Sequence, residues 1–205
     1  MYIGLVGKSC SGKNYVGELF SKKGYQVLDL DELCHKAYEL AAIKSSLKET
    51  FGPEVLDKGV VSRKALGKIV FDNPTMRTKL ENILYSWLKK EIFSQTQGSI
   101  TFLNGALLRR AGLDELCKLI IYVDAPYEDR LGRALARDGI TKEAFEKREA
   151  AQQDVDYRNN EYKAPVVIIT NDNNTKAPEL VRQINNICDR IKTISLKENE
   201  DNEEK

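Results

Sequence analysis

The stretch Gly7-Lys8-Ser9-Cys10-Ser11-Gly12-Lys13-Asn14 decides the fold of this chain, because it joins an apolar run to a segment with helical periodicity. Its spacing is G-x-x-x-x-G-K, the Walker A pattern, with Asn14 where that pattern has Ser or Thr. Glycines let such a loop curl so that its N–H groups face an anion, and the helix that follows adds the positive end of its dipole. Lys13 adds a point charge for the β- and γ-phosphates. The sequence therefore predicts a phosphate-binding loop.

Cys10 lies inside this loop, where a helix N-terminus lowers the pKa of a thiol. We interpret it as the filler of a variable position, because no reaction class indicated by the other residues needs a thiol. The other cysteines, Cys34, Cys117 and Cys188, are scattered, and the chain has one His. This usage argues against a zinc site or a disulfide framework and predicts a reducing cytoplasm.

Five short apolar runs predict β-strands, and helical spacing fills most of the chain between them. The runs are Tyr2–Val6, Gln26–Asp31, Ile100–Leu103, Leu119–Val123 and Val166–Ile169. Apolar strands that alternate with helices are typical of a parallel sheet with helices on both faces. We therefore predict an α/β chain of three layers, built as a P-loop fold around a five-stranded parallel sheet.

The charge-rich stretch between the second and third runs is mostly helical and too long for a simple crossover. We predict a core of residues 1–34 and 98–196, with a helical subdomain, residues 35–97, inserted at the carboxyl edge of the sheet. That edge is where α/β proteins bind ligands. Residues 197–205 carry five acids and two lysines with no apolar residue, which predicts a disordered tail.

The composition excludes several classes of protein. Among 205 residues, 32 Lys+Arg balance 31 Asp+Glu for a net charge of +1, whereas a dedicated nucleic-acid binder shows a basic excess. Phosphorylated small molecules remain compatible, because local Arg and Lys clusters hold them. No apolar run approaches the ~18 residues of a membrane span, and the start of the chain lacks the basic residues and length of a signal peptide.

Two carboxylates, Asp29 and Asp31, end the second apolar run. Strand alternation would place both on one face, where either accepts a proton from an acceptor hydroxyl or holds that hydroxyl in line with a γ-phosphate. Alternatively, Asp31 is the N-cap of a helix that starts at Glu32. The local sequence does not decide between these roles.

With these residues in place, the chain resembles the dephospho-coenzyme A kinase family from about Tyr2 to Asn173. Beyond the phosphate loop and the V-x-D-x-D element Val27–Asp31, an ordered series of motifs carries the likeness. These are Phe51-Gly52, Asp57 to Leu66, Phe71-Asp72-Asn73-Pro74, Leu107-Leu108, Arg133 to Asp138, Thr141-Lys142-Glu143, and Ala150-Ala151-Gln152 with Arg158. The chain departs from the family pattern at Asn14, at Leu84-Tyr85-Ser86 and at Ala106, and in a longer segment between Arg158 and Asn171.

The resemblance implies transfer of the ATP γ-phosphate to the 3′-hydroxyl of dephospho-coenzyme A, the final step of coenzyme A biosynthesis. It implies that Lys13 and the loop bind ATP, that Mg²⁺ takes Asn14 as a ligand, and that Asp31 positions or deprotonates the hydroxyl. ATP and dephospho-coenzyme A are the expected partners, with neither nucleic acid nor membrane. The alternatives are a kinase for another small acceptor, such as a nucleoside monophosphate, and a nucleotide-binding protein with little transfer activity.

Arginines complete the implied site. Arg130, Arg133 and Arg137 form one stripe at i, i+3 and i+7. The resemblance implies that Arg133, Arg137 and Arg158, in or beside a lid of about residues 138–160, cover the transferring phosphoryl group, and that Arg137 and Arg158 bind the nucleotide. For Arg130 alone we favour a solvated position beside neighbouring acids. Arg63 is predicted either to meet the phosphates of the acceptor or to lie on a surface helix.

Overall fold

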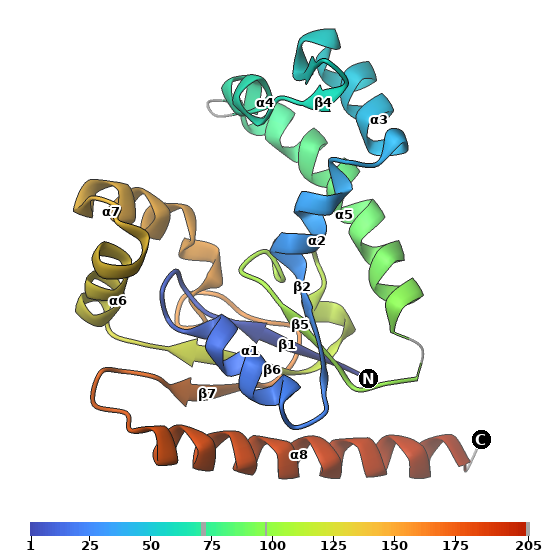
Figure 1. Cartoon of the computed structure of the whole chain (residues 1–205). Helices are drawn as coiled ribbons and strands as arrows, with labels where there is room; N and C mark the ends of the chain where they lie inside the picture. Colours follow the sequence, from blue (N-terminus) through green and yellow to red (C-terminus); the bar gives the residue numbers. More distant parts are fainter. Residues whose placement is uncertain (71–72, 97, 204–205) are drawn as a thin grey trace. The chain divides into compact units, whose positions relative to one another are not determined.

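The computed structural model describes residues 1–70, 73–96 and 98–203, and the chain forms two compact units (Figure 1). The first contains residues 1–28 and the chain from residue 98 onward, and the second contains residues 29–97. Asp29 and Asp31 therefore belong to the second unit. Within the described residues, no helix is both long and apolar enough to cross a membrane.

A five-stranded sheet forms the centre of the first unit, in the order β2-β5-β1-β6-β7. Its strands are β1 (Tyr2–Val6), β2 (Gln26–Asp29), β5 (Thr101–Asn104), β6 (Cys117–Asp124) and β7 (Val166–Thr170). β1 pairs in parallel with both β5 and β6, and β6 pairs in parallel with β7. The predicted α/β fold with a five-stranded parallel sheet is confirmed. Because the sheet is parallel, the carboxyl ends of its strands lie along one edge.

Helices α1 (Lys13–Ser21) and α8 (Ala177–Glu203) cover one face of this sheet. Phe20 of α1 and Ile184 of α8 are buried against inward-facing strand residues such as Leu5 and Phe102. The opposite face carries Gly4, where an added Cβ would lie 2.6 Å from Leu108 Cδ2. A glycine is therefore needed in β1 for the chain after β5 to pack this closely.

The remaining elements of the first unit follow β5 and β6 along the chain. They are η2 (Asp114–Leu116), α6 (Tyr127–Arg133), the π-helical turn η3 (Ala134–Asp138), α7 (Lys142–Ala151) and η4 (Gln153–Val155). Phe145 of α7 is fully buried and packs against Leu131 and Ala134. This small apolar cluster joins α7 to α6, so the segment predicted as a lid has a core contact of its own.

The second unit is helical around a buried cluster that includes Ile43, Leu47, Phe51 and Leu84. Its elements are α2 (Leu30–Ala37), α3 (Ala41–Phe51), η1 (Pro53–Val55), β3 (Leu56–Asp57), β4 (Val60–Val61), α4 (Arg63–Val70) and α5 (Pro74–Gln95). The sequence did not predict the antiparallel β3–β4 pair. Lys58 and Gly59 form its turn with φ of 49° and 81°, and two positive φ values in succession are typical of a tight hairpin.

The structure differs from the sequence predictions at two element boundaries. The strand expected to reach Asp31 ends at Asp29, and Asp31 lies in the first turn of α2. Helix α8 continues to Glu203, although we predicted a disordered tail from Lys197. Glu and Lys are good helix formers, and no Gly or Pro interrupts them, so an existing helix extends through them. Phe71 and Asp72 of the family motif, Gln97, and residues 204–205 lie outside the described residues.

Candidate functional site

The loop between β1 and α1 has a backbone that depends on its glycines. Gly12 has φ of 89°, and an added Cβ there would overlap the side-chain amide of Asn171. A Cβ at Gly7 would lie 2.5 Å from Ser11 Oγ and 2.7 Å from the carbonyl oxygen of Val123. Cys10 takes φ of 62° as a non-glycine residue. The loop is therefore tightly curled and packed on the ends of β6 and β7.

Two features of this loop fit an anionic ligand. The hydroxyl of Ser11 is buried without a hydrogen-bond partner in the described structure, which leaves a polar group unsatisfied. Gly12, the N-cap of α1, provides no side-chain cap for the first turn of that helix. The first N–H groups of a helix have no acceptor within it, so they are available to phosphate oxygens. These observations support the predicted phosphate-binding loop.

Lys13 lies between two amide side chains at the start of α1. Its ammonium donates to Oδ1 of Asn14 at 2.9 Å and to Oδ1 of Asn104 at 2.8 Å. Nδ2 of Asn104 in turn donates to Oδ1 of Asn14 at 3.2 Å. The predicted nucleotide-binding residues Lys13 and Asn14 are thus joined by a third residue, Asn104 at the end of β5, which sequence reasoning missed.

Arg133 of α6 donates hydrogen bonds to the backbone of the loop. It donates to the carbonyl oxygens of Cys10 and Ser11, at 3.3 and 3.4 Å, and to that of Asn171 at 2.7 Å. The side chain of Asn171 also donates to the carbonyl oxygen of Ser11 at 2.7 Å. In this structure the guanidinium of Arg133 therefore ties the loop backbone to the segment after β7.

The other two predicted arginines are exposed. Arg137 donates to Asp138 at 2.7 Å and to Sγ of Cys10 at 3.6 Å, and the hydrogen bond to Asp138 raises its pKa. Arg158 forms ion pairs with Asp124 and Asp156. Its guanidinium lies 5.0 Å from the ring centre of Tyr157. The structure thus brings Arg133 and Arg137 to the loop and places Arg158 at the end of β6.

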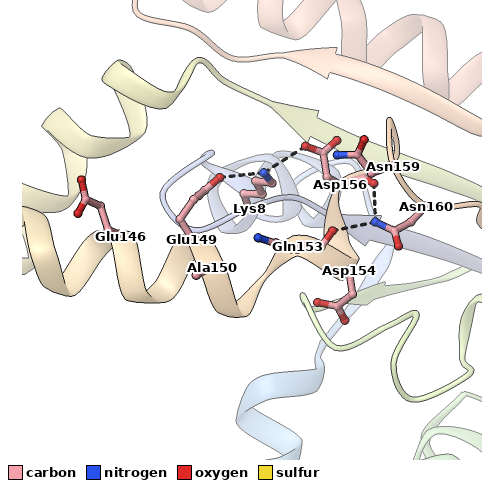
Figure 2. Close-up of a pocket in the computed structure, with 9 residues that line it drawn as sticks. All are labelled: Lys8, Glu146, Glu149, Ala150, Gln153, Asp154, Asp156, Asn159 and Asn160. Atoms are coloured by element: carbon pink, nitrogen blue, oxygen red, sulfur yellow. Dashed lines mark hydrogen bonds and ion pairs between the residues drawn. The ribbon is translucent and has the colours of Figure 1, made fainter.

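Lys8 joins the loop to α7 and the segment that follows it (Figure 2). Its ammonium lies 2.8 Å from Glu149 and 3.1 Å from Asp156. Burial opposes its charge, but the hydrogen bonds that the ammonium donates to both carboxylates outweigh burial and raise the pKa of Lys8. Ser9 N–H donates to Oε1 of Gln152 at 2.7 Å. A cavity of about 720 Å³ opens beside this network, lined by residues that include Glu146, Gln153 and Asn160.

Our prediction that Arg130 is solvated was wrong. The residue is 5% exposed, and its guanidinium binds Glu149 at 2.5 and 3.0 Å. It also donates to the carbonyl oxygens of Ala125 and Ser9. The helical spacing suggested pairing with neighbouring acids, whereas the partner lies 19 residues away on α7.

The second unit holds the two candidate carboxylates in different roles. Oδ1 of Asp29 accepts hydrogen bonds from the N–H groups of Asp31 and Glu32, both at 2.9 Å, so Asp29 is the N-cap of α2. Asp31 instead lines a cavity of about 380 Å³ with Tyr38 and Arg63. The prediction that the two carboxylates share one strand face was wrong, because the cap turns the chain into a helix after Asp29.

That cavity combines apolar walls with polar groups. Leu66, Val70 and Leu80 contribute apolar surface. The guanidinium of Arg63 lies 5.6 Å from the ring centre of Tyr38, within the range of a cation–π contact. Such a pocket can hold an aromatic ring and present a cation and a carboxylate to its polar substituents.

Comparison with known proteins identifies the family. A family model described as dephospho-CoA kinase matches residues 1–177. The chain belongs to the dephospho-CoA kinase family. A dephospho-CoA kinase of Fusobacterium nucleatum is 32% identical over 93% of this chain and 98% of its own length, and one of Bacillus licheniformis is 31% identical over 95% and 98%. A crystal structure of TT1252 from Thermus thermophilus superposes with a TM-score of 0.77 at 30% identity, covering 93% and 97% of the two chains.

Membership of the dephospho-CoA kinase family makes the chain an ATP-dependent kinase. The resemblance stated from the motifs is therefore confirmed. The residues that sequence reasoning missed, among them Asn104 and Asn171, lie where strands of the parallel sheet end. A polar residue directly after an apolar run is the signal by which such residues can be found.

Proposed function

We propose that this dephospho-CoA kinase divides its reaction between its two units. The first unit binds ATP through the loop from Gly7 to Asn14, and the second binds dephospho-coenzyme A in the cavity that contains Asp31 and Arg63. The product is phosphorylated at the ribose 3′-hydroxyl. The main support for this proposal is that the two carboxylates have different structural roles. Asp29 caps a helix, while Asp31 lines a cavity suited to a nucleoside.

On the nucleotide side, the loop N–H groups and the ammonium of Lys13 bind the ATP phosphates. The unpaired hydroxyl of Ser11 and the uncapped first turn of α1 support this role, because both leave donors to be satisfied by an anion. Arg137, which is exposed beside Cys10, is suited to contact the transferring group when the segment 138–160 closes. Arg158 is proposed to bind the nucleotide. Arg133 is proposed to support the loop that binds the nucleotide.

On the acceptor side, Asp31 accepts the proton of the 3′-hydroxyl as the hydroxyl oxygen attacks the γ-phosphorus. The bond between that phosphorus and the bridging oxygen breaks, and ADP leaves with the electron pair. Arg63 is suited to bind an acceptor phosphate, and Tyr38 offers a ring face to the base. This assignment favours the predicted acceptor role of Arg63 over a surface role.

Magnesium fits this site only as an ion shared with the nucleotide. Clusters of three or more potential His, Cys, Asp or Glu ligands are absent from the described part of the chain. Mg²⁺ needs few protein ligands when phosphates and water supply the rest. Oδ1 of Asn14 is the hard amide oxygen that would hold the ion, and it would have to give up one of the hydrogen bonds that it accepts from Lys13 and Asn104 in this structure. When bound, the ion neutralises charge on the β- and γ-phosphates.

The test compares Asp31→Asn with Asp29→Asn. We expect Asp31→Asn to lower kcat by about 10²-fold or more, with the affinity for ATP preserved. Asp29→Asn is the matched control, because Asn is as good an N-cap as Asp and keeps α2 in place. Steady-state ADP release with dephospho-CoA measures kcat, and equilibrium titration measures ATP binding. If Asp29→Asn lost activity while Asp31→Asn kept it, the assignment of Asp31 as the proton acceptor would be wrong. The kinase activity of the family would not be in question.

A further inference from the structure

Asn104 is the last residue of β5. It is 4% exposed and pairs in register with Leu5 of β1, two residues before the phosphate-binding loop begins. The next N–H, that of Gly105, donates to the carbonyl oxygen of Leu5 at 3.1 Å, which fixes the end of β5 against β1. The side chain of Asn104 therefore projects from a rigid part of the sheet rather than from a loop.

The two ends of the Asn104 amide perform different tasks. The oxygen accepts from Lys13 Nζ at 2.8 Å, while the nitrogen donates to Oδ1 of Asn14 at 3.2 Å. Oδ1 of Asn14 also accepts from Lys13 at 2.9 Å, so the three side chains close a ring of hydrogen bonds. The reverse orientation of the amide would place its NH₂ group against the ammonium, so the ring fixes one orientation.

Lysine is a flexible side chain with a compact charge, and it loses conformational freedom when a phosphate immobilises it. An ammonium that already lies in place at a buried amide loses less freedom on binding. A side-chain amide carries no net charge, so it directs the ammonium without cancelling the positive charge that the phosphates need. Asn104 thus meets both requirements of a group that pre-organises Lys13.

Asn104 lies beside the first turns of α1. A Cβ added at Gly17 would lie 3.7 Å from Nδ2 of Asn104, in ordinary van der Waals contact. We propose that Asn104 is a positioning residue for phosphoryl transfer, which holds the ammonium of Lys13 and the amide of Asn14 in the arrangement that receives the nucleotide phosphates. It acts through Lys13 and does not itself touch the reacting atoms.

The experiment is a double-mutant cycle on the full chain with ATP and dephospho-CoA as substrates. We expect Asn104→Ala to lower kcat/KM for ATP about tenfold when Lys13 is present, and by less than about twofold in the Lys13→Ala background. Thr101→Val, at the other end of β5, is the matched control. Thr101 is buried and donates to Gln26 at 2.9 Å, so its loss tests packing of the same strand without disturbing Lys13.

A second readout does not depend on catalysis. Acylation of Lys13 by an amine-reactive reagent, quantified by mass spectrometry in the absence of nucleotide, should be faster in Asn104→Ala than in the parent chain and unchanged in Thr101→Val. If Asn104→Ala does not fold, Asn104→Ser is judged by the same two criteria. Losses of equal size in both Lys13 backgrounds, or unaltered labelling of Lys13, would overturn the proposal. So would failure of both variants to fold, because it would assign Asn104 a purely structural role.

Discussion

Glu149→Gln tests the ionic contact that joins α7 to Arg130 and Lys8 in the first unit. The carboxylate of Glu149 binds the 5%-exposed Arg130 through two hydrogen bonds and also binds Lys8 at 2.8 Å. Removing one partner of a fully buried pair costs about 3–5 kcal/mol. Here the side chain of Glu149 is 20% exposed, and Arg130 keeps the carbonyl acceptors of Ala125 and Ser9. We therefore expect a loss of about 2 kcal/mol, which corresponds to a fall in Tm of about 4–8 °C.

The assay is thermal unfolding followed by circular dichroism at neutral pH, with Glu146→Gln as the control. Glu146 lies one turn earlier on α7, its side chain is 53% exposed, and its ion pair with Lys142 spans 4.0 Å. An exposed pair of this kind contributes little, so its loss should shift Tm by less than about 2 °C. Equal shifts for the two variants would refute the reasoning that burial makes the Glu149 contact costly to break.

The same contact predicts a dependence on pH. Burial raises the pKa of Glu149, but hydrogen bonds from Arg130 and Lys8 outweigh burial and hold that pKa below its usual value. A carboxylate whose pKa is lower in the folded than in the unfolded chain stabilises the fold above its unfolded pKa, about 4.3. That stabilisation is lost as pH falls through the folded pKa. The difference in stability between the parent chain and Glu149→Gln should therefore be full at pH 7 and shrink in the acid range below about pH 4.

Two further predictions concern the nucleotide side. Lys13→Ala removes a positive charge that binds the phosphates of ground-state ATP and the negative charge that develops during transfer. The value of kcat/KM should therefore fall at least about 10²-fold, or ~2.7 kcal/mol. Near-native turnover of this variant would show that the loop is not the catalytic phosphate site. Asn14→Ser should lower the Mg²⁺ concentration needed for half-maximal ADP release, because a short hydroxyl reaches the ion with less displacement than an amide on a longer stem. A magnesium titration in which Asn14→Ser needs as much Mg²⁺ as the parent chain, or more, would contradict that expectation.

The sheet was predictable because each of its strands is an apolar run with a clear break on either side. β1, for example, spans Tyr2–Val6 in both the prediction and the structure. The second strand was harder, because Asp29 and Asp31 alternate as strand residues do, and the prediction extended it by two positions. The sequence alone does not distinguish an Asp that caps a helix from an Asp in a strand, because the difference lies in the hydrogen bonds of its side chain. Here both acceptor bonds of Asp29 go to the first turn of α2, which ends the strand.

The residues of the loop from Gly7 to Asn14 could be named from the sequence because their spacing is local, and their binding of phosphate stays a prediction. The same reasoning failed at Arg130, because the helical stripe it forms with Arg133 and Arg137 carries no information about burial. Arg130 is covered by Glu149, and Arg133 by the carbonyl oxygens around Cys10. The three arginines of one helical stripe therefore bind an acid of α7, the loop backbone and a neighbouring carboxylate. This division depends on which elements pack together.

Partners that are distant in sequence explain why the support of the loop was missed altogether. Lys8 and Glu149 are separated by 141 positions, and Lys13 and Asn104 by 91, so no periodicity connects them. The contact with Asn104 also changes the interpretation of Asn14, which stands where the family pattern has Ser or Thr. Considered alone, an amide in place of a hydroxyl weakens the expected metal ligand. Beside a second amide that donates to it, Asn14 becomes part of the ring that holds Lys13. A residue that deviates from its family motif is therefore best judged with the residue that contacts it, because the pair, rather than either position, determines where the ammonium lies.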